Sequence, residues 1–169
     1  MRLNIDQTWD GAPVGQDEEV VIGLIGARRH LMLQVDAPFH ADPRPEADPG
    51  SCWGLWEHEV VELFVLGDGG RYLEVELGPH GHFLVLKLGG YRHVMETSLP
   101  LDFAARIDGD RWRGVARLDR ALLPKGPHTI NAYAIHGTGE DRRYLAWSRL
   151  KGDKPDFHLL SCFVAVQLP

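Results

Sequence analysis

Apolar and polar residues alternate with a period of two in many short segments of this chain, and residues that favour turns separate the segments. This period is typical of half-buried β-strands, because successive side chains of a strand point to opposite faces of its sheet. Nine strands are predicted, at Val20 to Gly26, Leu31 to Val35, Val60 to Leu66, Tyr72 to Leu77, Phe83 to Leu88, Trp112 to Leu118, Thr129 to His136, Arg143 to Trp147 and Phe163 to Val166. The pattern indicates an all-β protein, a single antiparallel β-sandwich in the style of a jelly roll.

The segments between these strands hold one helical turn and one long loop. The turn is expected from Leu118 to Leu123, where Asp119 can cap its start and Pro124 can end it. The stretch from Ala37 to Trp56 is irregular and carries four prolines, which stiffen a loop by fixing φ. Loops of this length often line binding sites. Because no repeat or linker interrupts the pattern, residues 1 to 169 are expected to form one domain.

Composition narrows the range of partners. The chain has 18 basic and 24 acidic residues, a formal net charge of -6, which disfavours binding to a phosphate backbone. No stretch approaches the roughly 18 to 20 apolar residues of a membrane helix, and the first residues lack the apolar core of a secretory signal, so a cytoplasmic protein without a membrane partner is expected. Cys52 and Cys162 lack a metal-type or redox-type spacing and are expected to be reduced thiols.

The segment from Val60 to Leu88 is expected to form a three-stranded meander. If its first turn pairs Leu63 with Leu73, then Glu62 lies opposite Glu74, and a second turn can place Lys87 beside Glu74. Like charges opposite each other destabilise a sheet, so a neighbouring cation is expected. This row has two interpretations. It is either a compensated charge ladder on a half-wet sheet or the polar floor of a ligand cleft, with Tyr72 alongside.

Aromatic and histidine residues supply the candidate ligand contacts. Trp53, Trp56 and Trp147 lie at predicted strand ends or in loops, where they either line a rim or plug the core, whereas Trp112 is expected in the core. An indole can stack on the apolar face of a sugar, and ionisable groups can bind its hydroxyls. The residues predicted to bind the ligand are Trp53, Trp56, Glu57, His136, Trp147, Lys154, Asp156 and His158.

Two of these histidines leave structural alternatives open. His136 shares a predicted strand face with Ala132 and Ala134, whose small side chains leave room for a ligand or for a large core residue. His158 follows Asp156, which can orient an imidazole or instead lock the loop through backbone amides.

Several runs of residues resemble an uncharacterised family named after a human chromosome 4 open reading frame. These runs are Thr8-Trp9-Asp10-Gly11, Ala37-Pro38-Phe39 with Asp42-Pro43, Leu55-Trp56-Glu57 followed by Glu59-Val60-Val61-Glu62, Tyr72-Leu73-Glu74-Val75-Glu76-Leu77 with Pro79-His80-Gly81, Ala134-Ile135-His136-Gly137, Arg143-Tyr144 and Lys154-Pro155-Asp156-Phe157-His158. The resemblance spans nearly the whole chain and implies a fold without an established activity.

A more distant resemblance is to the type 9 carbohydrate-binding module and to DOMON-like sandwiches. It is carried by a tryptophan and an acid ahead of a Val-Glu strand, by a Tyr-x-Glu-x-Glu strand, and by a late Trp-Ser followed by Lys-Pro-Asp-Phe-His. That wider group implies binding of a sugar or of haem, and it does not imply catalysis.

The sequence therefore predicts a β-sandwich that binds a small polar ligand, with a saccharide favoured. The alternatives are a small enzyme that uses a His and Glu acid-base pair, a haem-binding DOMON-like domain and a non-catalytic interaction module. No cofactor is predicted and no catalytic residue is assigned. Calcium ligands would come from Asp42, Glu46 and Asp48, and a haem would take a His, Met32 or Met95 as its axial ligand.

Overall fold

The computed structural model describes residues 1–169 and contains twelve β-strands and five 3-10 turns, with no α-helix. The strands are β1 (Arg2–Ile5), β2 (Val20–Gly26), β3 (His30–Pro38), β4 (Val60–Leu66), β5 (Arg71–Leu77), β6 (Phe83–Gly89), β7 (Val94–Glu96), β8 (Asp102–Asp108), β9 (Arg111–Asp119), β10 (His128–His136), β11 (Arg143–Ala146) and β12 (Val164–Val166). The 3-10 turns are η1 (Leu55–Glu57), η2 (Asp68–Gly70), η3 (Arg120–Leu122), η4 (Gly139–Asp141) and η5 (Leu160–Cys162).

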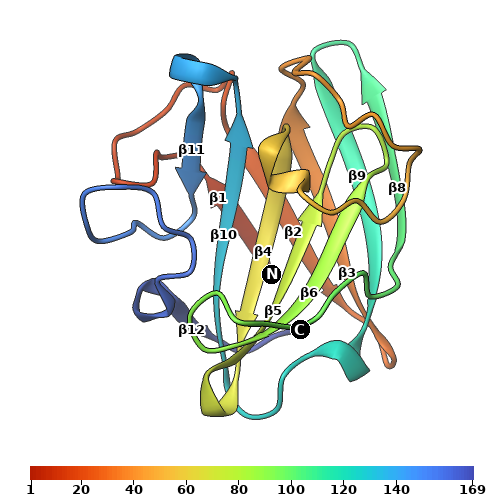
Figure 1. The fold of residues 1–169 in the computed structure, drawn as a ribbon, viewed down its shortest axis with the longest axis vertical. Helices are drawn as coiled ribbons and strands as arrows, with labels where there is room; N and C mark the ends of the chain where they lie inside the picture. Colours follow the sequence, from red (N-terminus) through yellow and green to blue (C-terminus); the bar gives the residue numbers. More distant parts are fainter.

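The strands form two antiparallel sheets that face each other (Figure 1). We call them the first sheet, in the order β1-β2-β3-β9-β8, and the second sheet, in the order β11-β10-β4-β5-β6-β7 with β12 paired to β10. The predicted all-β sandwich is confirmed.

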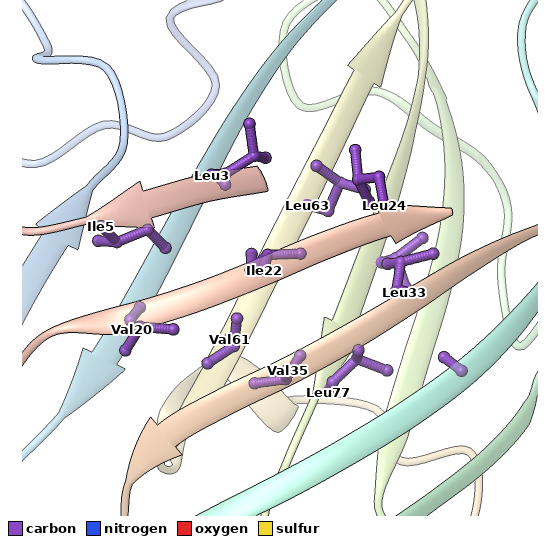
Figure 2. Packing of buried hydrophobic residues seen from close by; sticks show 14 of the residues in the cluster. Leu3, Ile5, Val20, Ile22, Leu24, Leu33, Val35, Val61, Leu63 and Leu77 are labelled. Atoms are coloured by element: carbon purple, nitrogen blue, oxygen red, sulfur yellow. The ribbon is translucent and has the colours of Figure 1, made fainter. Parts of the chain in front are cut away.

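The main hydrophobic core lies between the two sheets. Strands of the first sheet direct Leu3, Ile22 and Leu33 toward Val61 and Leu63 of the second sheet (Figure 2). All five residues are buried, and they occupy alternate positions of their strands because every second side chain faces the opposite sheet. Trp112 of β9 lies in the same core, as predicted.

All nine predicted strands are present, and three further strands escaped prediction. β1 and β7 have only four and three residues, too few to show a period. β8 lies at an edge of the first sheet, where its inward residues stay partly exposed. Its two alanines also weaken the alternation of apolar and polar residues along the strand. The predicted helical turn is the 3-10 turn η3, and its cap is confirmed because the Asp119 carboxylate accepts a hydrogen bond from the Ala121 N–H at 2.9 Å.

The predicted registers of the meander were wrong. Glu62 pairs with Glu76, a shift of two residues, and Leu86 pairs with Glu74, a shift of one residue. The first turn is centred one residue later than expected, and its Gly67 N–H donates to the Arg71 carbonyl at 2.9 Å. The second turn is one residue longer than the expected turn from Pro79 to His82, and its Gly78 N–H donates to the His82 carbonyl at 2.9 Å. The two-residue shift keeps every side chain on its expected face, whereas the one-residue shift moves Lys87 to the opposite face.

Two further findings bear on the expectations from composition. Cys52 and Cys162 are both free thiols, and Cys162 is buried. None of the helical segments has the length and apolar character needed to cross a membrane.

Candidate ligand-binding cleft

The outer face of the second sheet is covered rather than open to solvent. Alternate residues of β4 and β5 that point away from the main core, among them Phe64 and Tyr72, lie in a second hydrophobic cluster. Residues from η1 and from the C-terminal segment cover them, including Leu55, Phe157 and Cys162. Strands buried on both faces explain why β4 reads as an almost continuous apolar run.

A cleft of about 330 Å³ opens in this cover, a size that accommodates a small ligand. Strands of the second sheet form its floor, and η1 and the segment that follows β11 form its walls. The lining residues are Trp53, Trp56, Glu57, Glu62, Glu74, Leu86, Leu88, Arg92, Val94, Ile135, Arg142, Tyr144, Pro155, Phe157 and His158.

Two indoles stand on one wall of the cleft. Trp53 is 61% exposed although it is a large apolar residue. Its ring meets the Trp56 ring edge to face, with the centroids 5.1 Å apart at 81°. The Trp56 indole N–H donates to Glu57 at 3.0 Å, which fixes the ring orientation. A flat, exposed ring held beside a fixed one offers a stacking surface for a ligand.

A hydrogen-bonded pair anchors the other wall. The Tyr72 hydroxyl lies 2.7 Å from His158 Nδ1, and it accepts a hydrogen bond from the Arg92 N–H at 3.3 Å. This arrangement lets the hydroxyl donate to the imidazole. Burial, and next the Arg92 charge, lower the pKa of His158 to about 4. His158 is therefore neutral at physiological pH and presents a polar group without a charge.

Asp156 holds this wall in place from behind the cleft. Its carboxylate accepts hydrogen bonds from the Tyr91 hydroxyl at 2.7 Å, from the Arg92 guanidinium at 3.0 Å and from the His158 backbone N–H at 3.1 Å. Burial alone would raise the pKa of Asp156, but the bonds from Tyr91 and Arg92 outweigh it and lower the pKa. Asp156 thus locks the loop rather than orienting the imidazole, which is the structural alternative stated for this residue.

Three buried carboxyl groups lie on the floor or directly beside it. Glu62 is 2% exposed, Glu74 is 4% exposed and Glu76 is fully buried. Burial raises all three pKa values, that of Glu74 to about 7 and those of Glu62 and Glu76 well above their ordinary range, and the neighbouring carboxyls add to the rise for Glu62 and Glu76. Taken as carboxylates, both Glu76 oxygens and one Glu74 oxygen have no donor.

The structure brings together about half of the predicted ligand contacts. Trp53, Trp56, Glu57 and His158 line the cleft, and so do Glu62 and Glu74 of the predicted polar floor. Tyr72 lies directly behind His158.

Four predicted contacts lie elsewhere. Lys87 occupies the other face of β6 and pairs with Glu96 at 3.2 Å, because of the register shift described above. Trp147 packs against the main core, and Lys154 is exposed and makes no ion pair. His136 follows the core-facing alanines of β10 to the end of the sandwich, where it lies 3.0 Å from Glu18 and stacks on His40.

The residues named as calcium candidates do not form a cluster. Asp42 accepts a hydrogen bond from the Gly137 N–H at 2.6 Å, and Glu46 and Asp48 are exposed. No group of three or more His, Cys, Asp or Glu side chains lies close enough to hold a metal ion.

Sequence reasoning missed the two arginines of the cleft, Arg92 and Arg142, because neither belongs to a periodic pattern. It also missed Tyr144 and Phe157, although both lie inside runs that carried the family resemblance. The signal that could have found them is that both runs, one in β11 and one in the C-terminal loop, belong to the family resemblance, which suggests that they contribute to one site.

The fold is that of the β-sandwiches of carbohydrate-binding modules. A candidate carbohydrate-binding protein of Bacteroides uniformis ATCC 8492 superposes with a TM-score of 0.76 at 18% identity, over 98% of this chain and 84% of that chain. A family 9 carbohydrate binding module from Caldicellulosiruptor kristjanssonii, solved in complex with glucose, superposes with a TM-score of 0.50 at 12% identity, over 96% of this chain and 78% of that chain.

Sequence relatives define the family. The chain is 42% identical to the human UPF0462 protein C4orf33 over 172 aligned residues, which cover 96% of this chain and 86% of the relative. It is 40% identical to the homologue from Danio rerio, with 96% and 87% covered. The chain belongs to this UPF0462 family, which confirms the resemblance found in the sequence. No protein-family model matches it.

Proposed function

We propose that the cleft binds a carbohydrate. The observation that carries the proposal is Trp53, which is 61% exposed beside Trp56 at the mouth of a preformed cleft with a polar floor. Two neighbouring indoles at a cleft mouth leave apolar surface in contact with water, and a ligand that covers this surface removes it from water. The apolar C–H face of a sugar ring matches an indole face, and its hydroxyls need the polar groups that the floor supplies.

The polar residues of the cleft can each bind hydroxyl groups of the sugar in a different way. Glu62 and Glu74 accept hydrogen bonds, or donate them when protonated. The neutral His158 ring offers Nε2, since Nδ1 is already bonded to Tyr72. The Arg92 and Arg142 guanidiniums contribute positive charge at the rim. Such a site would bind sugars with dissociation constants of roughly micromolar to millimolar, about -8 to -4 kcal/mol.

Tryptophan fluorescence titration with a broad panel of mono- and disaccharides tests the proposal. We expect at least one sugar to shift the emission saturably. By calorimetric titration, Trp53→Ala should abolish binding of that sugar while Trp53→Phe retains part of it, since a phenyl ring still stacks. Val115→Ala, an exposed position on the first sheet, is the matched control and should leave the affinity unchanged. A flat response across the panel contradicts carbohydrate binding.

Acid-base catalysis on the bound ligand is the second candidate function. It is favoured by one observation: the cleft brings Glu74, with a pKa raised to about 7, together with the neutral His158. A carboxyl with a pKa near neutrality can donate or accept a proton at physiological pH. Release of the aglycone from a panel of nitrophenyl glycosides measures this activity. Turnover that Glu74→Gln abolishes supports catalysis, and binding without turnover assigns the cleft to recognition alone.

A further inference from the structure

The floor of the cleft holds three acidic side chains, none of which forms an ion pair. Glu62, Glu74 and Glu76 alternate across β4 and β5 on the same face, and all three are at least nine-tenths buried. Glu62 and Glu74 line the cleft, and Glu74 Oε2 has no hydrogen-bond donor. A buried carboxylate is costly unless it is paired, so this face is incomplete without a donor or a cation.

The two nearby arginines do not complete it. The Arg142 guanidinium donates hydrogen bonds to three backbone carbonyls, those of Trp56, Glu57 and Gly137. The Arg92 guanidinium donates hydrogen bonds to the Asp156 carboxylate and to the Tyr91 hydroxyl. Neither forms an ion pair with a floor carboxyl, although each lies in the cleft lining. Burial raises the pKa values of Glu62 and Glu74, and it outweighs the Arg142 charge, which lowers the pKa of Glu62, and the Arg92 charge, which lowers that of Glu74.

We propose that the preferred ligand of the cleft is an amine-bearing saccharide, whose ammonium group sits against Glu62 and Glu74 while its ring stacks on Trp53. This inference rests on the proposed carbohydrate function and names the ligand class. An ammonium has three donors in a compact group, so it can serve both carboxyls at once. An acetamide at the same position cannot, because it is uncharged and has one N–H.

Ammonium binding should displace protons from the floor. The ligand charge favours the carboxylate forms of Glu62 and Glu74, whose pKa values the protein on its own raises through burial. The titratable and charged groups that line the cleft or lie against its floor are Cys52, Glu57, Glu62, Tyr72, Glu74, Glu76, Arg92, Tyr133, Arg142, Tyr144 and His158. Glu74, with a pKa raised to about 7, can release a proton near pH 7 when a cation binds beside it.

Calorimetric titration tests the inference with sugars that differ only at carbon 2. Glucosamine, galactosamine and mannosamine are compared with their N-acetyl forms and with glucose, galactose and mannose, at pH 7 in two buffers of different ionisation enthalpy. We expect one amine to bind at least about 10-fold more tightly than both its matched acetamide and its hydroxyl form, with net proton release. In Glu62→Gln and Glu74→Gln, the preference for the amine over its matched acetamide and hydroxyl forms, each measured on the same variant, should fall to within about 2-fold, because the amide side chain carries no charge.

The outcomes separate the two proposals. Equal or weaker binding of the amines, with the neutral sugars bound, overturns the ammonium assignment and leaves carbohydrate binding standing. An amine preference that survives both Gln variants also overturns it, because the charge then acts elsewhere. Absence of binding by every sugar overturns the proposed function together with this inference. Because glutamine matches glutamate in size and needs no buried charge, both variants should fold, and their melting curves verify this.

Discussion

Arg142 is bonded to the backbone of Trp56, 86 residues away in the sequence. The same guanidinium also donates to the carbonyl of Glu57 at 3.0 Å and to that of Gly137 at 3.2 Å. Through the bonds to Trp56 and Glu57, Arg142, which directly precedes β11, holds the 3-10 turn η1 that forms a wall of the cleft. Arg142 is therefore a positioning residue for the indoles, in addition to lining the cleft.

Replacing Arg142 should weaken ligand binding through the wall that it positions. Arg142→Ala leaves three carbonyl groups without their donor, and we expect a loss of about 1 to 3 kcal/mol in the free energy of unfolding. The sugar affinity should fall by about 10-fold, and fluorescence of Trp56 should report a less ordered indole. Arg117→Ala, an exposed arginine on the first sheet, is the control, and an equal effect there would contradict the positioning role.

Tyr72 should stabilise the fold through its hydroxyl group. The residue is buried, and its hydroxyl connects His158 to the Arg92 backbone. Tyr72→Phe removes this connection and leaves an imidazole nitrogen unpaired, so we expect a loss of about 1 to 3 kcal/mol in urea unfolding. Tyr91→Phe, which removes a hydroxyl from an exposed ring, should cost less. Equal losses would show that burial of the bond does not matter.

The floor carboxyls should make the protein less stable as the pH rises. A carboxyl with a raised pKa binds more protons in the folded state than in the unfolded state, so its contribution is complete below about pH 4.5 and is lost as the pH rises through the folded pKa. For Glu74, with a pKa of about 7, the loss amounts to about 3 kcal/mol. The lowered pKa of His158 acts in the opposite direction, since it adds stability as the pH rises from about 4 to 6.5.

The difference between variant and parent isolates the Glu74 contribution. Glu74→Gln should raise the melting temperature relative to the parent at pH 8 and lose most of this advantage at pH 5. Thermal denaturation at both pH values measures the effect; the His158 contribution cancels in the comparison, and the change includes the coupled response of Glu62 and Glu76. A constant difference between the two pH values would show that the Glu74 pKa is not raised.

The inter-sheet core should depend strongly on Leu63. This residue is 1% exposed at the centre of β4 and faces the first sheet (Figure 2). Leu63→Ala leaves a cavity and should cost about 2 to 5 kcal/mol in the free energy of unfolding, whereas Val115→Ala at an exposed site should stay within about 0.5 kcal/mol. Chemical denaturation measures both. A loss below about 1 kcal/mol at Leu63 would contradict the tight packing described.

The sequence revealed the strands more fully than their registers. Period-two alternation was sufficient to find β4, because Val61, Leu63 and Val65 all face the core. It was not sufficient to place Lys87, since the face of β6 depends on a turn whose length is set by local geometry, including the positive φ of Gly81. Composition and spacing do not encode that geometry, so a one-residue error reversed the face.

The candidate cleft was predictable to the extent that its residues belong to recognisable runs. Trp56, Glu62 and His158 lay in such runs and were named from them. The contacts that assemble the cleft join distant segments, as in the bonds from Tyr72 to His158 and from Arg142 to Trp56. Neither pair has a local pattern, because each partner is chosen by the way the C-terminal loop and η1 fold over the second sheet. The prediction that His136 binds the ligand was wrong for the same reason: its neighbours Ala132 and Ala134 face the main core and do not line a ligand site.

Indole signals in a nitrogen-15 correlation spectrum test the central claim most directly. The chain has five tryptophans, and each contributes one resolved N–H probe. On titration with a binding sugar, we predict shifts of the Trp53 and Trp56 indoles, while the buried Trp112 indole of the inter-sheet core stays unchanged. Saturable shifts confined to residues of the first sheet, with Trp53 and Trp56 unmoved, would contradict the account.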